Sequence, residues 1–204
     1  MYYFRTIDPQ SWQKRDAHDS LTYVDLVPRE GELSVWVEDG SEKSLANAAL
    51  AFSLCIKKIS DLYYVHIPDA ILAEAGFTFR QENSKTPYIQ WQDKHTNIVI
   101  HTIDNLIKMA EIIIQHIPEK EPDYVAEQSI REAFYDAISR DEVEIDFNSK
   151  QYSNLRKPLR FEEKRRKAPI DFSRLSKAKD VNTVSCPLCK GSGKVRTDHV
   201  VKQK

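Results

Sequence analysis

The sequence has few glycines, few cysteines and no long apolar run. Only five of its 204 residues are glycine, which excludes a collagen-like repeat. No apolar run approaches the roughly 18 residues that cross a bilayer, and the first twelve residues lack the basic and apolar regions of a signal peptide. Three cysteines are an odd number, which does not suit a disulfide framework. We therefore expect a cytoplasmic protein without a membrane segment.

Charge is divided unevenly along the chain, although the net charge is only -1. Residues 1–149 contain 14 Lys and Arg against 26 Asp and Glu, a net charge of -12. Residues 150–204 contain 16 Lys and Arg against 5 Asp and Glu, a net charge of +11. Clustered basic side chains attract anions, so we expect the C-terminal part to bind nucleic acid, an acidic protein or the acidic part of its own chain.

The apolar pattern of residues 1–146 predicts an acidic α+β body. It favours a mixed small sheet with a central buried helix and two helices at its C-terminal end, because helices and strands do not alternate as they do in a doubly wound sheet. The expected helices cover 45–59, with Ser44 as N-cap, 69–75, 104–117 and 122–140. The expected strands cover 21–27, 32–38, 62–67, 77–79, 88–92 and 97–101, the last two as a hairpin.

Residues 147–182 are rich in Lys and Arg and poor in aliphatic residues. Such a composition does not bury enough apolar surface to fold alone, so we interpret this segment as a linker or a docking arm, and we expect residues 1–146 to fold without it. The alternative is that the arm lies across the acidic body and cancels its charge. The candidate nucleic-acid-binding residues are Arg156, Lys157, Arg160, Lys164, Arg165, Arg166 and Lys167.

Residues 183–204 contain a motif that suits metal binding, Cys186-Pro187-Leu188-Cys189-Lys190-Gly191-Ser192-Gly193. Two thiolates three residues apart reach one tetrahedral metal at about 2.3 Å, and the glycines let the backbone turn beneath the sulfurs. The motif resembles one CxxCxGxG repeat of the DnaJ-type cysteine-rich zinc domain, and the resemblance implies Zn2+ as cofactor. That family uses paired repeats, so that four cysteines close each site, whereas this chain has one repeat.

The remaining zinc ligands have three candidate sources. His199 is a candidate third ligand, because neutral imidazole binds zinc. Cys55 lies in a predicted apolar helix, where we interpret it as a small buried hydrophobe. A homodimer that shares the metal, with Cys186 and Cys189 from each chain, satisfies the ligand count best. A thiol redox role is weaker, because Gly-Ser-Gly after the motif is a poor helix start.

A second resemblance covers about a fifth of the chain. The segment from His66 to Phe77, followed by Ile98-Val99-Ile100, has the order strand, Ile-Pro turn, short helix, glycine and strand. This order resembles the AbrB-like and SymE-like swapped-hairpin domains. The resemblance implies DNA bound by basic residues on the strand side, which here are Arg80, Lys85 and Lys94.

Two further groups of residues have a structural interpretation beside a functional one. His66, His95 and His101 fall near predicted strands and could cluster, but we interpret them as structural histidines. The acidic run Asp141, Glu142, Glu144 and Asp146 could bind a divalent cation, but we interpret it as a solvated face or as the contact for the basic arm. The chain contains no GxSxG or HExxH motif, so no catalytic residue is named.

These observations favour a non-enzymatic, zinc-binding adaptor or regulatory protein. Its acidic body would bind a protein partner or a second copy of itself, and its arm and knuckle would contact nucleic acid or a nucleoprotein complex. A chaperone-like or assembly factor that binds polypeptide through the DnaJ-like knuckle is one alternative. A nuclease-like enzyme with an unidentified site is the other.

We predict that zinc copurifies with the reduced protein and that Cys186→Ser with Cys189→Ser removes it. If two chains share the site, the metal-to-chain ratio is about one to two, because four thiolates close one tetrahedral site. Elemental analysis of protein prepared without chelators measures both quantities, and Cys55→Ser is the control that keeps its zinc. Unchanged zinc in the double variant would overturn the prediction.

Overall fold

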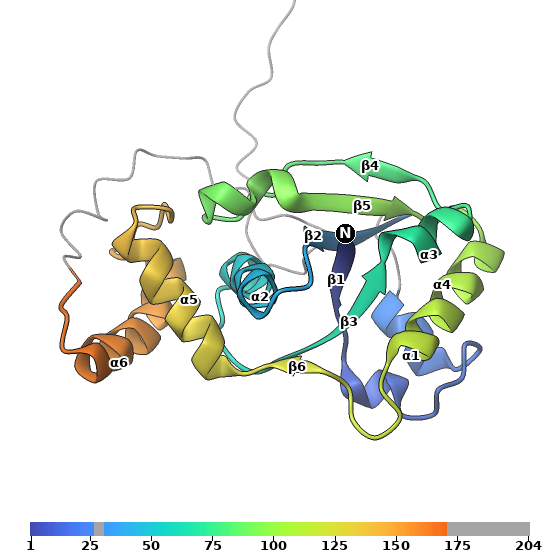
Figure 1. The fold of residues 1–204 in the computed structure, drawn as a ribbon, viewed down its shortest axis with the longest axis horizontal. Coiled ribbons are helices and arrows are strands. Elements are labelled where there is room, and N and C mark those ends of the chain that lie inside the picture. Colours follow the sequence, from blue (N-terminus) through green and yellow to red (C-terminus); the bar gives the residue numbers. More distant parts are fainter. Residues whose placement is uncertain (27–30, 171–204) are drawn as a thin grey trace, which may run out of the picture.

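The fold is organised around a six-stranded antiparallel sheet. The computed structural model describes residues 1–26 and 31–170 (Figure 1). The order of the strands in the sheet is β4-β5-β2-β1-β3-β6, and each neighbouring pair is antiparallel. The strands are β1 (Tyr2–Thr6), β2 (Glu32–Glu38), β3 (Leu62–Pro68), β4 (Phe79–Gln81), β5 (His95–Val99) and β6 (Tyr124–Val125). The α+β class is confirmed, but the sheet is antiparallel rather than mixed.

Helices cover both faces of the sheet (Figure 1). The first face packs against α2 (Glu42–Ile56), and α5 (Glu127–Ser139), η3 (Lys150–Leu155) and α6 (Arg156–Arg166) form an outer layer over α2. The second face packs against α1 (Ser20–Leu26), α3 (Asp69–Glu74) and α4 (Ile103–His116). Two 3-10 helices complete the set, η1 (Pro9–Trp12) and η2 (Ile89–Lys94).

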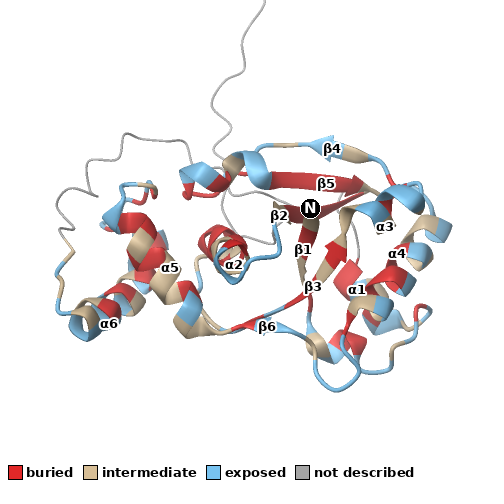
Figure 2. Ribbon diagram, viewed as in Figure 1, coloured by how far each residue is buried: buried red, intermediate tan, exposed pale blue. Residues whose placement is uncertain are grey.

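Strand β1 lies between β2 and β3 and contributes to both apolar layers. Phe4 is fully buried on the α2 side, next to Trp36 of β2, and Tyr3 is buried on the α4 side. Because side chains alternate along a strand, this one segment supplies core residues to two separate clusters. Figure 2 shows buried residues on the sheet and on the facing sides of α2 and α4.

Helices with a local cap begin close to where the sequence indicates. Thr102 caps α4 through a 3.1 Å hydrogen bond from the Asn105 N–H, so that the helix begins at Ile103, one residue before the expected start. Helix α2 begins earlier than expected, because Ser41 rather than Ser44 is the N-cap and accepts from the Ser44 N–H at 3.1 Å. The strand expected over 21–27 is wrong for residues 21–26. These residues belong to α1, and Asp19, just before the helix, accepts a hydrogen bond from the Leu21 N–H in its first turn.

The hairpin expected between 88–92 and 97–101 is also wrong. Residues 89–94 form η2, and β5 pairs instead with β2 and with β4, where Phe79 lies opposite Ile98. The helix expected from residue 122 begins five residues later, because Tyr124 and Val125 first pair with β3 as β6. The start of α5 is then fixed by Asp61, which accepts from the Glu127 N–H at 2.7 Å.

The body extends beyond the boundary expected at residue 146. Residues 150–166, interpreted above as part of a linker or docking arm, form η3 and α6 and pack on α5. The few apolar side chains of this segment are enough to anchor it, because they join the apolar cluster on the α2 side of the sheet. Tyr152, Leu155 and Leu159 are all buried in that cluster, as is Phe147 just before them. A fragment that ends at residue 146 therefore lacks part of its core, contrary to our expectation.

The zinc motif with Cys186, Cys189 and His199 lies outside the described residues, so it stays a prediction. Cys55 does lie within them. As expected of a structural cysteine, it is buried in α2, with its sulfur 3.7 Å from Ser84 Oγ. Within residues 1–26 and 31–170, no helix combines the length and the apolar character that a bilayer crossing requires.

We predict that Leu159→Ala lowers the free energy of unfolding by about 3 kcal/mol, the usual cost of a cavity in place of a buried leucine. Leu159 is fully buried. The control is Leu21→Ala in α1, where the leucine is 48% exposed and the change is expected to stay below about 0.5 kcal/mol. Urea denaturation measures both. Equal stability of the two variants would show that α6 is not part of the cooperative unit.

Candidate functional site

The basic side chains of α6 fall into two groups, and the first group faces α5. Arg165 Nη2 lies 2.9 Å from Glu132 Oε1 and 2.7 Å from Glu162 Oε2. Arg166 forms an ion pair with Asp136 at 2.5 Å, and its guanidinium lies 4.6 Å from the centre of the Tyr135 ring. These two arginines hold α6 on the acidic surface of α5. Within residues 147–170, the described part of the arm, the acidic contact is therefore α5 and not the run from Asp141 to Asp146.

Glu162 is the centre of this contact. Its side chain is fully buried, and it accepts from Arg165 at 2.7 Å and from the Gln128 amide at 3.2 Å. Arg166 and Arg131 lie at 3.7 and 3.9 Å from its carboxylate. A buried carboxylate is stable only with such partners. The hydrogen bond from Arg165 to Glu162 in turn raises the pKa of that arginine.

The second group lies outside the contact that Arg165 and Arg166 make with α5. Its members have no ion pair with any acidic side chain in the part of the chain that the structure describes, although Arg156 donates to Asn148 Oδ1 at 3.0 Å. They are Arg156, Lys157, Arg160, Lys164 and Lys167. Three of them, Arg156, Arg160 and Lys164, are four residues apart, so that they lie on one face of the helix about 6 Å from each other along its axis.

This outward group is unfavourable for the isolated helix. Like charges four residues apart repel one another by about 0.2 to 0.5 kcal/mol per pair. Arg156 and Lys157 also lie in the first turn of α6, where the helix dipole disfavours cations. An anion on this face would relieve both repulsions.

The end of α2 adds two lysines beside α6. Helix α2 closes with Lys57 in the left-handed conformation, at φ 60° and ψ 34°, and the Lys58 N–H donates back to the Ser53 carbonyl at 3.0 Å. Glycine is the usual residue at such a position. Lys57 Nζ donates to Gln151 Oε1 at 3.1 Å, whereas Lys58 is exposed and has no acidic partner among the described residues.

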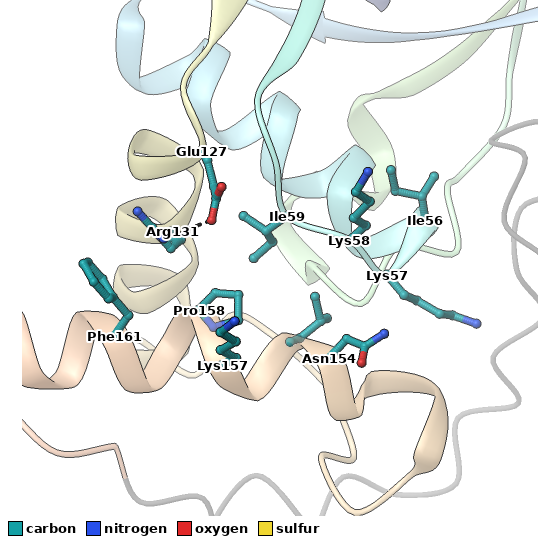
Figure 3. A pocket seen from close by; sticks show the side chains of 11 residues that line it. Ile56, Lys57, Lys58, Ile59, Glu127, Arg131, Asn154, Lys157, Pro158 and Phe161 are labelled. Atoms are coloured by element: carbon teal, nitrogen blue, oxygen red, sulfur yellow. Dashed lines mark hydrogen bonds and ion pairs between the residues drawn. The ribbon is translucent and has the colours of Figure 1, made fainter.

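A hollow of about 500 Å³ separates the end of α2 from α6 (Figure 3). Lys57, Lys58 and Ile59 line one wall, and Lys157, Pro158 and Phe161 line another. Glu127 and Arg131 of α5, which pair with each other at 2.9 Å, close the hollow between them. A second hollow of about 550 Å³ continues along α6 past Arg160 and Lys164. Lys157 and Phe161 line both, so that the two hollows meet at these side chains. Together they form a basic groove, defined by these residues.

Phe161 is one of the groove residues that the sequence interpretation missed, together with Lys57 and Lys58. Its ring is 52% exposed in the middle of the basic side chains. The Arg131 guanidinium lies 4.5 Å from the ring centre, and Arg131 is itself paired with Glu127 at 2.9 Å. The available signal in the sequence was an aromatic residue four positions after one lysine and three before another, which places all three on one helix face.

Other candidate residues of the sequence do not form a site. No group of three or more His, Cys, Asp or Glu side chains that could hold a metal occurs within residues 1–26 and 31–170, so His66, His95 and His101 do not form a metal cluster. His66 Nε2 contacts the carboxylate of the buried Glu38, and His95 is fully buried on β5. Of the strand-side basic residues, Arg80 pairs with Glu32 at 2.5 Å, and Lys85 and Lys94 are exposed.

No protein-family model matches this chain, and no curated protein or solved structure matches it either. Function is therefore inferred from the residues of the groove and from the chemistry that they allow.

We predict that Glu162→Ala lowers the free energy of unfolding by about 2 to 3 kcal/mol. This is below the usual cost of breaking a buried pair, because Arg165 and Arg166 are partly exposed and solvent screens their charges. The control is Glu119→Ala, which makes the same change in net charge at an exposed residue. Thermal and urea denaturation measure the difference. If the two variants were equally stable, the carboxylate would not be what holds α6 in place.

Proposed function

We propose that the protein binds nucleic acid through the basic groove between α2 and α6. One observation carries the proposal: the cations of α6 that face α5 are paired with carboxylates, while those that face outward have no acidic partner among the described residues. The arm therefore uses only part of its charge to dock on its own body. The remaining charge is left for another anion.

A nucleic acid suits this surface because its phosphates repeat along the strand. The outward cations also repeat, one helical turn apart, so that several phosphates can be neutralised at once. Each neutralised phosphate releases a condensed counterion, which supplies affinity without regard to base sequence. Lysine and arginine line most of the groove, beside one amide, Asn154, and one hydroxyl, Ser153, so we expect only a slight sequence preference.

The wider proposal is a non-enzymatic, zinc-binding adaptor. Residues 171–204 contain eight Lys and Arg against three Asp, and the knuckle formed by Cys186 and Cys189, with His199 as a third zinc ligand, would give this basic segment a fixed structure. The acidic surface of residues 1–149 would bind a protein partner or a second copy of the chain. The cytoplasmic location stays a prediction.

We predict that Lys157→Ala, Arg160→Ala and Lys164→Ala together weaken the binding of labelled single-stranded DNA and RNA and reduce the slope of log affinity against log salt by about two to three, because each lost phosphate contact removes a little under one. The control triple variant, Lys85→Ala, Lys94→Ala and Lys120→Ala, removes the same charge from exposed lysines outside the groove. Full-length protein is titrated at two salt concentrations.

Two outcomes would overturn the proposal. If the control triple lost more affinity than the groove triple, the strand-side surface implied by the AbrB-like resemblance would be the better interface. If the protein bound neither DNA nor RNA at low salt, an acidic protein partner would be the better ligand of the groove.

A further inference from the structure

Phe161 is an exposed aromatic ring among cations. A helix that bound only phosphates would need no aromatic ring at this position. An exposed Phe also adds little to the stability of the free protein, because much of its apolar surface stays in water. The ring lies one turn after Lys157 and one turn before Lys164, on the same face of α6. An anionic ligand held by both lysines therefore passes directly over the ring.

The ring is also held in place before any ligand binds. The Arg131 guanidinium lies 4.5 Å from its centre, and Arg131 is fixed by Glu127 at 2.9 Å and by Gln128 Oε1 at 2.8 Å. A ring with a fixed position loses little conformational entropy when a second flat group stacks on it. Ile59 and Pro158 supply apolar walls on either side of the hollow that Phe161 lines (Figure 3).

We infer that this hollow receives an unpaired base, and that single-stranded nucleic acid is the ligand class of the groove. The inference rests on the proposed function and deepens it. A single strand presents phosphates and base faces together, so its backbone can contact Lys157 and Lys164 while one base stacks on Phe161. The bases of a duplex are paired and stacked on each other, and a duplex offers this groove only its phosphates.

Charge argues against the C-terminal segment of the chain itself as the occupant of the groove. Residues 171–204 carry a net charge of +5. Lys57, Lys58, Lys157, Arg160 and Lys164 repel such a segment, while they attract a polyanion. An anionic ligand with flat apolar groups is the chemistry that the groove complements.

The experiment compares four probes on the full-length protein by fluorescence anisotropy: a single-stranded RNA, the matching single-stranded DNA, a duplex of equal length and an abasic strand with the same number of phosphates. We expect the base-carrying single strands to bind at least about fivefold more tightly than the abasic strand, the effect of one stacked base. Phe161→Ala should remove that difference and leave the abasic affinity and the salt slope unchanged.

Two variants control for folding and for loss of apolar surface. Phe161→Trp keeps an aromatic face and should restore the preference for base-carrying strands. Ile103→Ala removes a side chain that is 74% exposed on α4, and it should leave all four affinities unchanged. Thermal denaturation of each variant confirms that α6 is still docked.

The inference and the proposed function fail in different ways. Equal loss of affinity for abasic and base-carrying strands in Phe161→Ala, or tighter binding of the duplex than of the single strands, would overturn the inference alone. Absence of binding to every probe at low salt would overturn the proposed function as well. Phe161-dependent binding to vesicles of anionic phospholipid, without any nucleic-acid binding, would assign the groove to a membrane surface.

Discussion

A sheet with apolar side chains on both faces requires helices on both sides, and this requirement places the other elements of the described chain. Strand β1 illustrates the constraint, since Phe4 and Tyr3 enter opposite clusters from one central strand. On the second face α1, α3 and α4 complete the cover. On the first face α2 also has apolar side chains on the side away from the sheet and needs a cover of its own, which α5, η3 and α6 provide. The basic groove exists because this outer cover ends beside the last turn of α2.

Packing within this outer cover also explains how α6, which consists mostly of charged residues, stays folded. Leu155 and Leu159 give it a narrow apolar stripe, and the buried Glu162 collects the arginines of α5 and α6 around one carboxylate. Buried ion pairs of this kind contribute little net stability when compared with apolar residues, but they penalise every arrangement in which one partner is missing. They therefore fix which face of α6 turns inward. Because these ion pairs fix the inward face of α6, the cations on its other side remain exposed.

The parts of the fold that could be predicted from the sequence are those with local causes. Helix α4 carries its own cap at Thr102 and an apolar stripe of helical period, and it was predicted to within one residue. The start of α5 depends on Asp61, which is 66 residues away, and the partner of β5 is set by where β4 lies in the sheet. No pattern of neighbouring residues contains that information. Helix α1 was missed for a different reason, because the Asp19 cap is local but was not recognised.

The candidate site shows the same division. Its cations could be listed from the sequence, because clustered Lys and Arg are visible there, but their division into docking and outward groups could not. Arg165 and Arg166 belong to the docking group because Glu132 and Asp136 of α5 lie beside them, whereas Arg160 and Lys164 pair with no carboxylate of α5. Helix α5 is more than twenty residues away in sequence. The proposed role of Phe161 likewise depends on residues distant in sequence, because Arg131 on α5 contacts its ring and Ile59 after α2 lines the same hollow.

The groove and the C-terminal motif gain from being on one chain. In the proposed function, fifteen residues separate Ile170 from Cys186, so two basic segments contact the same strand at a distance that the chain itself limits. Once one segment is bound, the second meets its phosphates at an effective concentration in the millimolar range, provided the intervening segment spans the two sites. Each contact can then remain weak and salt-dependent, while the pair holds a nucleic acid that neither segment would retain alone. In the proposed function, the acidic surface of residues 1–149 away from the groove would then bind the protein partner, because its charge repels the phosphates of the bound strand.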